Sequence, residues 1–286
     1  MTTFAIAGVQ MAAAPSNNLA GMARLVELTM ARFPWVQMIV FGELCVHGVS
    51  LRLAEPMPGD TEQRLCELAR QHHVWLIPGS IYEADSGRVF NTAPVIDPDG
   101  QVVARHRKLY PFLPYEGGVE SGVSHTLFDV PGVGRFGLSI CYDMWFPETT
   151  RALVWGGAEV IIHPSLTNTM DRDLELSIAR TSAAINQCYF FDINNTAALG
   201  NGRSIVVGPE GDVIHEASTL EEIMPVIVDL DKLRRTRREG LLGLGQVLKS
   251  FRDSNVPYPQ YALQNRRSEP LATLGPLTRT ARKDQP

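Results

Sequence analysis

Short apolar runs of the kind found in buried strands alternate along this chain with stretches whose apolar residues recur at helical spacing. Residues 3–9 are mostly apolar, whereas Leu19, Met22 and Leu25 in the next stretch recur every three residues. Such alternation predicts an α/β fold. Strands are expected at 3–9, 36–41, 74–81, 89–96, 102–105, 127–130, 135–140, 159–162, 188–193, 204–207, 213–214 and 224–230, and helices at about 19–33, 60–72, 147–155 and 171–187.

Turn sequences join several of these strands directly. Asp97-Pro98-Asp99-Gly100 and the segments 131–134 and 209–212 are rich in Pro, Gly and Asp, so each predicts a hairpin. Hairpins pair strands antiparallel, while helical crossovers pair them parallel. The sequence therefore predicts mixed sheets.

Residues 1–250 are expected to form one domain, because no linker-like shift in composition interrupts them before about residue 232. Residues 251–286 are expected to be a tail, since the segment 255–286 holds five prolines and few large apolar residues. A tail of this composition either wraps a partner subunit or is loosely ordered.

Composition excludes several classes of function. The 26 basic and 31 acidic residues give a net charge of −5, which disfavours non-specific binding to nucleic acid or anionic membranes. No apolar run approaches the length of a bilayer span, and the N-terminus lacks a secretory pattern, so a cytoplasmic protein is expected. The chain has four cysteines, Cys45, Cys66, Cys141 and Cys188, and they form no CxxC pair. The histidines form no HExxH set, so neither a structural metal nor a metal cofactor is expected.

Cys141 is the strongest candidate for a reactive group. It follows the strand-like GRFGLSI and precedes YDMWFPE, in which a helix is expected to begin. A nucleophile on a sharp strand-to-helix turn is exposed at the strand end, and a nearby helix N-terminus favours the thiolate. The alternative is that Cys141 is a small buried hydrophobe, as most free cysteines are.

Three charged residues also lie at or just beyond predicted strand ends: Glu43 after MIVFG, Lys108 in ARHRKLYPF, and Glu116 in PYEGGVESG. Taken singly, Lys108 fits a solvated lysine and Glu116 a surface loop. Together with Cys141 they can converge on one edge of a sheet. A thiol needs a base to accept its proton, and Glu43 can serve as that base. Lys108, together with a backbone N–H beside the nucleophile, can stabilise an oxyanion.

The chain resembles the nitrilase superfamily, the carbon–nitrogen hydrolases with a Glu–Lys–Cys catalytic set. The matching segments are VFGELCVHG, FNTAPVIDPDGQVVARHRKLYPF, LSICYDMWFPETTRALVWGGAEVIIHPS and GNGRSIVVGPEGDVIHEAS, and the resemblance covers roughly residues 3–235. It implies a four-layer αββα sandwich without a cofactor, which assembles as a homodimer or a larger homo-oligomer.

The resemblance also assigns roles. It implies that Glu43 is the base, Lys108 the oxyanion-stabilising cation and Cys141 the nucleophile, and that Glu116 positions substrate and lysine. The segment CYDMWFPE resembles the amidase-like branch, since true nitrilases usually carry Cys-Trp-Glu and N-carbamoyl-D-amino-acid hydrolases Cys-Asn-Asp at this point.

The expected reaction is hydrolysis of a small carboxamide to a carboxylic acid and ammonia through a cysteine thioester. An N-carbamoyl amino acid or ureido acid amidohydrolase stays open, as do a nitrilase, an acyl transferase and a non-catalytic binding relative. The expected partner is therefore a small amide or ureido substrate, with an aliphatic, aromatic or ω-amidated dicarboxylate acyl group.

Tyr142, Trp145 and Asn168 are weaker candidates for contacts with substrate. Tyr142 and Trp145 flank the nucleophile, although Trp145 can equally pack in the core, and Asn168 fits an ordinary turn. No Arg or Lys motif reserves the pocket for a carboxylate. The basic run 234–238 is expected to be a solvated or subunit-facing helix end, not a nucleic-acid site.

Overall fold

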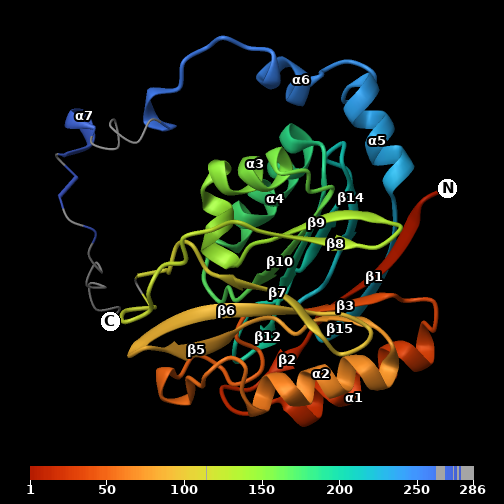
Figure 1. Ribbon diagram of the computed structural model, residues 1–286, viewed down its shortest axis with the longest axis vertical. Coiled ribbons are helices and arrows are strands. Elements are labelled where there is room, and N and C mark those ends of the chain that lie inside the picture. Colours follow the sequence, from red (N-terminus) through yellow and green to blue (C-terminus); the bar gives the residue numbers. More distant parts are fainter. Residues whose placement is uncertain (114, 262–267, 273, 276, 278–286) are drawn as a thin grey trace.

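The computed structural model describes residues 1–113, 115–261, 268–272, 274–275 and 277. Two β-sheets lie face to face at the centre of the molecule (Figure 1). The first has seven strands in the order β15-β1-β3-β4-β6-β5, with β7 also paired to β6. Its strands are β1 (Thr3–Gln10), β3 (Met38–Phe41), β4 (Trp75–Ile77), β5 (Ile81–Asp85), β6 (Arg88–Ile96), β7 (Val102–Arg107) and β15 (Glu222–Asp229).

The second sheet has six strands in the order β14-β13-β11-β10-β9-β8. Parallel pairs at its centre are flanked by antiparallel hairpins, so both sheets are mixed, as the turn sequences predicted. Its strands are β8 (Thr126–Val130), β9 (Gly134–Leu138), β10 (Val160–Ser165), β11 (Tyr189–Asn194), β13 (Ile205–Val207) and β14 (Val213–Glu216); a separate small pair joins β2 (Ala12–Ala13) to β12 (Thr196–Ala197).

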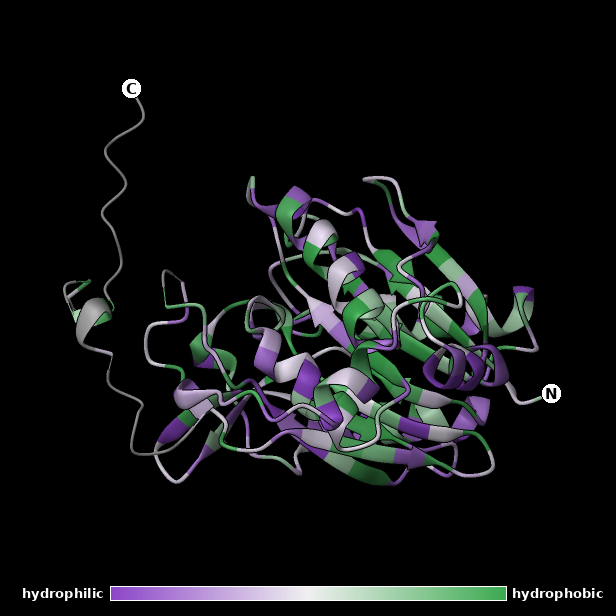
Figure 2. Cartoon of the chain, turned by 90° about the horizontal axis from the view of Figure 1, so that it is seen from above, coloured by the Kyte–Doolittle hydropathy of each residue, from purple (hydrophilic) through white to green (hydrophobic). Residues whose placement is uncertain are grey.

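Helices cover the outer face of each sheet and complete four αββα layers (Figure 1). Helices α1 (Leu19–Arg32) and α2 (Asp60–His72) lie on the first sheet, and α3 (Pro147–Trp155) and α4 (Arg172–Asn186) lie on the second. Figure 2 shows apolar residues concentrated on the central strands. This architecture confirms the predicted α/β fold class.

Three buried apolar clusters correspond to the three interfaces between layers. Phe4 and Met38 of the first sheet pack with Phe136 of the second in the central cluster. Met22 of α1 packs with Ile39 on one side of the sandwich, and the other outer cluster joins α4 to the second sheet. Each central strand is therefore buried on both faces, which explains its nearly continuous apolar sequence.

One predicted strand is wrong. The run 74–81 is not one strand, because β4 ends at Ile77 and β5 begins at Ile81. Gly79 lies between them with φ +79°, which only glycine adopts without strain, and its position lets the chain turn.

The basic run 234–238 lies at a helix end, where Arg235 and Arg238 are exposed. Two of its other members have partners within the chain: Arg234 pairs with Glu159, and Arg237 donates to the carbonyls of Gln187 and Ala158.

The C-terminal part leaves the sandwich after α5 (Leu230–Glu239). Helix α6 (Val247–Arg252) crosses the predicted domain boundary at residue 250, and Phe251 contacts the exposed Trp155 edge to face. Residues 252–261 are exposed and include the short turn Pro259–Tyr261; Glu269–Ala272 forms α7. The rest of the predicted tail, at 262–267, 273, 276 and 278–286, lies outside the described residues.

Candidate active site

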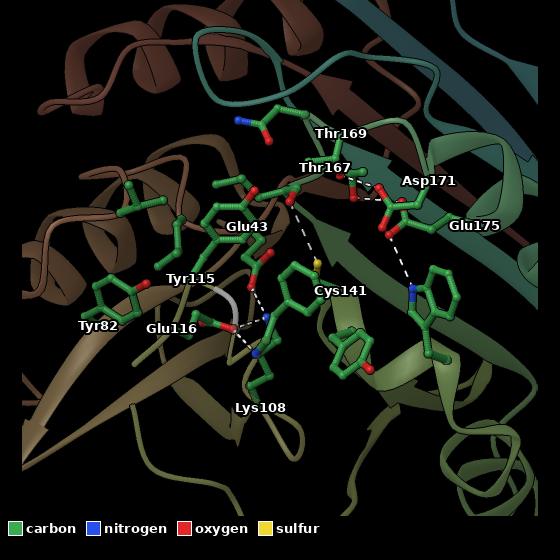
Figure 3. A pocket seen from close by; sticks show the side chains of 17 residues that line it. Glu43, Tyr82, Lys108, Tyr115, Glu116, Cys141, Thr167, Thr169, Asp171 and Glu175 are labelled. Atoms are coloured by element: carbon green, nitrogen blue, oxygen red, sulfur yellow. Dashed lines mark hydrogen bonds and ion pairs between the residues drawn. The ribbon is translucent and has the colours of Figure 1, made fainter. Parts of the chain in front are cut away.

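Glu43, Lys108, Glu116 and Cys141 line one cavity of about 230 Å³ (Figure 3). Glu43 follows β3, Lys108 follows β7, and Cys141 follows β9 at the first residue of the 3₁₀ turn Cys141–Trp145. Glu116 was expected at a strand end, but it lies in the loop between β7 and β8, eight residues after Lys108. The strand ends predicted from the sequence therefore meet in space, although they lie up to 98 positions apart in the chain.

The ammonium of Lys108 lies between two carboxylates. Its Nζ is 2.7 Å from Glu43 Oε1 and 2.6 Å from Glu116 Oε2. Asn91 on β6 bridges the same pair, because its Nδ2 donates to Glu43 Oε1 and to Glu116 Oε1 at 2.8 Å each. The backbone N–H of Phe112 donates to Glu116 Oε2 at 2.7 Å. These contacts fix Lys108 and both carboxylates, and Asn91 was not predicted as a site residue.

Burial and neighbouring charge set the protonation of this cluster. Burial raises the pKa of Glu43, and the charge of Glu116 adds to that rise while Lys108 opposes it. Burial by itself would lower the pKa of Lys108, but the charges of Glu43 and Glu116 outweigh it and hold that pKa well above its usual value. Lys108 is therefore a permanent cation, and Glu43 is a stronger base than an exposed glutamate.

Cys141 has a positive φ of +46°, which is uncommon for a residue with a side chain. Its Sγ lies 3.9 Å from the carbonyl oxygen of Leu166, so the resting thiol donates weakly there. Burial raises the pKa of the thiol well above its usual value, and the charge of Glu43 raises it further. At neutral pH the site holds a neutral thiol beside a base, not a preformed thiolate.

Asp143 connects the Lys108 segment to the turn at Cys141. Its Oδ1 accepts from the backbone N–H groups of Leu109 and Tyr110 at 3.0 and 2.9 Å. Its Oδ2 accepts from the N–H of Ile140 at 3.0 Å and lies 3.1 Å from His106 Nε2. One fully buried carboxylate thus ties together the segments that carry the lysine and the thiol, and no separate sequence signal predicted it.

The backbone at Glu43 is also held on both sides. Its N–H donates to the carbonyl of Ser165 at 3.0 Å, and its carbonyl accepts from Asn195 Nδ2 at 2.7 Å. Beside it, a Cβ at Gly79 would come within 1.8 Å of the Gly42 carbonyl oxygen. The close approach of these two segments therefore requires glycine at position 79.

Tyr142, Trp145 and Asn168 all line the cavity, and their contacts with substrate stay a prediction. Trp145 also packs partly against the apolar cluster under α3 and α4. Asn168 is exposed. Aromatic rings that were not predicted complete the apolar wall: Tyr82, Phe112 and Tyr115.

A second buried charged group borders the cavity. Arg172 Nη1 is 3.0 Å from Glu175 Oε2 and 2.8 Å from Asp192 Oδ2. Glu175 Oε2 also accepts from Thr167 Oγ1 at 2.7 Å, and its Oε1 accepts a long 3.5 Å bond from Trp145 Nε1. Glu175 and Asp171 line the cavity, and neither was predicted. From the sequence, Glu175 could be identified only as a polar residue of a predicted helix.

Two further properties concern the described residues as a whole. No group of three or more His, Cys, Asp or Glu side chains among them is placed to bind a metal ion. Every helix in this part of the chain is too short or too polar to cross a bilayer.

A four-layer αββα sandwich with a buried cysteine, a buried lysine and two buried glutamates around one cavity is the arrangement that the nitrilase superfamily resemblance implied. The model of the Carbon-nitrogen hydrolase family matches residues 3–238, and the chain belongs to this family. This membership confirms the resemblance to the nitrilase superfamily and its amidases.

Individual relatives agree with that assignment. Omega-amidase NIT2 of Homo sapiens is 33% identical over 201 residues, which are 65% of this chain and 72% of that protein. The crystal structure of Nit3 of Saccharomyces cerevisiae, a member of branch 10 of the nitrilase superfamily, superimposes with a TM-score of 0.77 at 28% identity, over 83% of this chain and 94% of that one. An amidase from Nesterenkonia sp. shares the fold, with a TM-score of 0.73 at 23% identity over 82% of this chain and 94% of that chain.

Proposed function

We propose that this protein hydrolyses the carbon–nitrogen bond of a small primary carboxamide through a thioester on Cys141. The observation that carries the proposal is the Lys108 ammonium held between Glu43 and Glu116 in the cavity that contains the thiol. The relatives named omega-amidase and amidase support an amide as the substrate.

In the first half of the reaction Glu43 accepts the proton of Cys141 as the sulfur attacks the carboxamide carbon. The raised pKa of the Glu43 carboxyl makes it a competent base for a thiol that is neutral at rest. Lys108 and the backbone N–H of Tyr142 stabilise the oxyanion. The carbon–nitrogen bond then breaks, Glu43 returns its proton to the leaving nitrogen, and ammonia departs from the thioester.

In the second half water replaces ammonia. Glu43 takes a proton from the water that attacks the thioester carbon, the carbon–sulfur bond breaks, and the thiol recovers its proton. Glu116 does not exchange protons in this scheme. It is a positioning residue, which holds Lys108 from the side opposite Glu43 and is itself held by Asn91.

The test is ammonia release from a panel of primary amides, ureido acids and nitriles, with Cys141→Ala and Cys66→Ala as a matched pair. Cys66 lies on α2 outside the cavity, so its variant is expected to keep full activity. Release from amides that only Cys141→Ala abolishes supports the proposal. Ammonia release only from ureido acids or only from nitriles would reassign the reaction. Activity in Cys141→Ala would refute the assignment of Cys141 as the nucleophile.

A further inference from the structure

The cavity has acidic side chains on both sides of the thiol. Figure 3 shows Glu175 and Asp171 on the side of Cys141 away from Glu116. Thr169 Oγ1 donates to the carboxylate of Asp171, which is half-buried. An acyl group bound at the thiol and extending away from Lys108 therefore points toward two carboxylates.

Within the described lining of the cavity, no cation is left over for a carboxylate on the substrate. Among the described residues that line the cavity, Lys108 is the sole cationic side chain, and both Glu43 and Glu116 already bind it. Arg172 does not line the cavity, and its guanidinium pairs with Asp192 and donates to the carbonyl of Arg203. A carboxylate-bearing amide would meet like charge in a largely buried site.

Glu175 is well placed to bind a hydrogen-bond donor. Its Oε2 is occupied by Arg172 and Thr167, but its Oε1 has a single long contact, with the indole of Trp145. Since Arg172 is shared between Glu175 and Asp192, one guanidinium faces two carboxylates and the group carries excess negative charge. Tyr142 and Trp145 line the same cavity, and aromatic rings attract cations.

We propose that the preferred substrate is a carboxamide whose acyl group ends in an amine, and that Glu175, assisted by Asp171, binds the ammonium. This inference rests on the proposed amidase function and specifies its substrate class. It excludes ω-amidated dicarboxylates as preferred substrates. Burial raises the pKa of the Glu175 carboxyl, and a bound ammonium would oppose that rise by replacing the solvation that this carboxylate lacks.

The test compares three amides that share a four-methylene chain and differ in the terminal group: 5-aminopentanamide, hexanamide and the monoamide of adipic acid. Charge-assisted hydrogen bonds predict that kcat/KM for the amine exceeds that for hexanamide about tenfold to hundredfold, with the carboxylate below both. A preference for the monoamide of adipic acid, or equal rates for all three, would overturn the inference and leave the amidase function intact.

Variants locate the ammonium site. Glu175→Gln keeps the shape and the contact with Thr167 but removes the charge, so the preference for amine over hexanamide is expected to fall to within about threefold. Asp171→Asn is expected to lower it less, and provides the test if Glu175→Gln does not fold. Asp173→Asn is the matched control, because Asp173 lies on the same helix but is exposed and pairs with Arg203. An unchanged preference in both Glu175→Gln and Asp171→Asn would contradict the assignment.

Binding separates failure of the inference from failure of the amidase function. In Cys141→Ala, calorimetry with the three amides reports recognition without turnover, and 5-aminopentanamide is expected to bind most tightly. If wild type releases no ammonia from any amide, the proposed function fails, yet tighter binding of the amine by Cys141→Ala would still support the ammonium site. Equal binding, or tighter binding of the carboxylate, would refute it.

Discussion

Two buried groups beside Cys141 have the same charges but present different members to the cavity. In each, one cation lies between two carboxylates: Lys108 between Glu43 and Glu116, and Arg172 between Glu175 and Asp192. In the first group the cation reaches the cavity, whereas in the second only a carboxylate does. The net charge of such a group therefore does not by itself define its role toward the substrate. The side chain that faces the cavity decides whether the group can stabilise an anion or a cation there.

Removing the cation that faces the cavity should have the largest effect. Lys108→Met deletes an oxyanion donor and leaves Glu43 and Glu116 unpaired, so kcat on a primary amide is expected to fall by about 10³-fold. Ammonia release measures it, and Lys232→Met, on α5 outside the cavity, is the control. Retention of activity within tenfold of wild type would contradict a catalytic role for Lys108.

Removing the other cation should act on stability. Arg172→Met leaves two buried carboxylates without their partner, which is expected to lower the free energy of unfolding by about 3–5 kcal/mol. Denaturant unfolding measures this, with the exposed Arg180→Met on the same helix as control. If Arg172→Met is instead as stable as wild type and loses kcat as Lys108→Met does, the contrast between the two groups is wrong.

His163 lies near the second group and should make its surroundings sensitive to pH. Burial lowers the pKa of His163 to about 4, and Ser139 Oγ is 2.7 Å from its Nδ1. Between pH 6.5 and 4 the unfolded chain binds a proton that the folded chain does not, so stability falls as pH falls, by up to about 3 kcal/mol.

Unfolding measured across that range in wild type and His163→Gln tests this dependence. The variant lacks the titrating ring and is expected to show a shallower loss of stability between pH 6.5 and 4. Identical slopes in the two proteins would rule out His163 as a source of the pH dependence.

The smallest expected effect is a shift in the pH profile. Activity should be lost as pH falls through the raised pKa of Glu43, because the protonated carboxyl cannot accept the thiol proton. Glu116→Gln removes one negative charge near Glu43, so the acid limb of kcat/KM should move to lower pH. Glu120→Gln, in the same loop but exposed, should leave it in place. A shift to higher pH would show that Glu116 acts on Glu43 mainly through Lys108.

The sequence predicted the first group and missed the second for a physical reason. Glu43 and Cys141 follow apolar runs and Lys108 follows a predicted strand, so each appears as a polar residue at a strand end, and the motifs around them are those of the nitrilase superfamily. Glu175 and Arg172 lie in an amphipathic helix, where a charged residue is normally solvated. Only the packing of α4 onto β11 buries them with Asp192.

The amino-acid sequence by itself determined the alternation of strands and helices, the mixed sheets and the strand-end positions of Glu43, Lys108 and Cys141, because these depend on local hydrophobic periodicity and turn chemistry. The tertiary structure decided which further residues hold or line the site: Asn91 in mid-strand, Asp143 within the nucleophile turn, and Glu175 on the far wall. Their contacts join segments up to 48 residues apart. Side-chain burial and orientation arise only when the layers pack, so no local pattern encodes them.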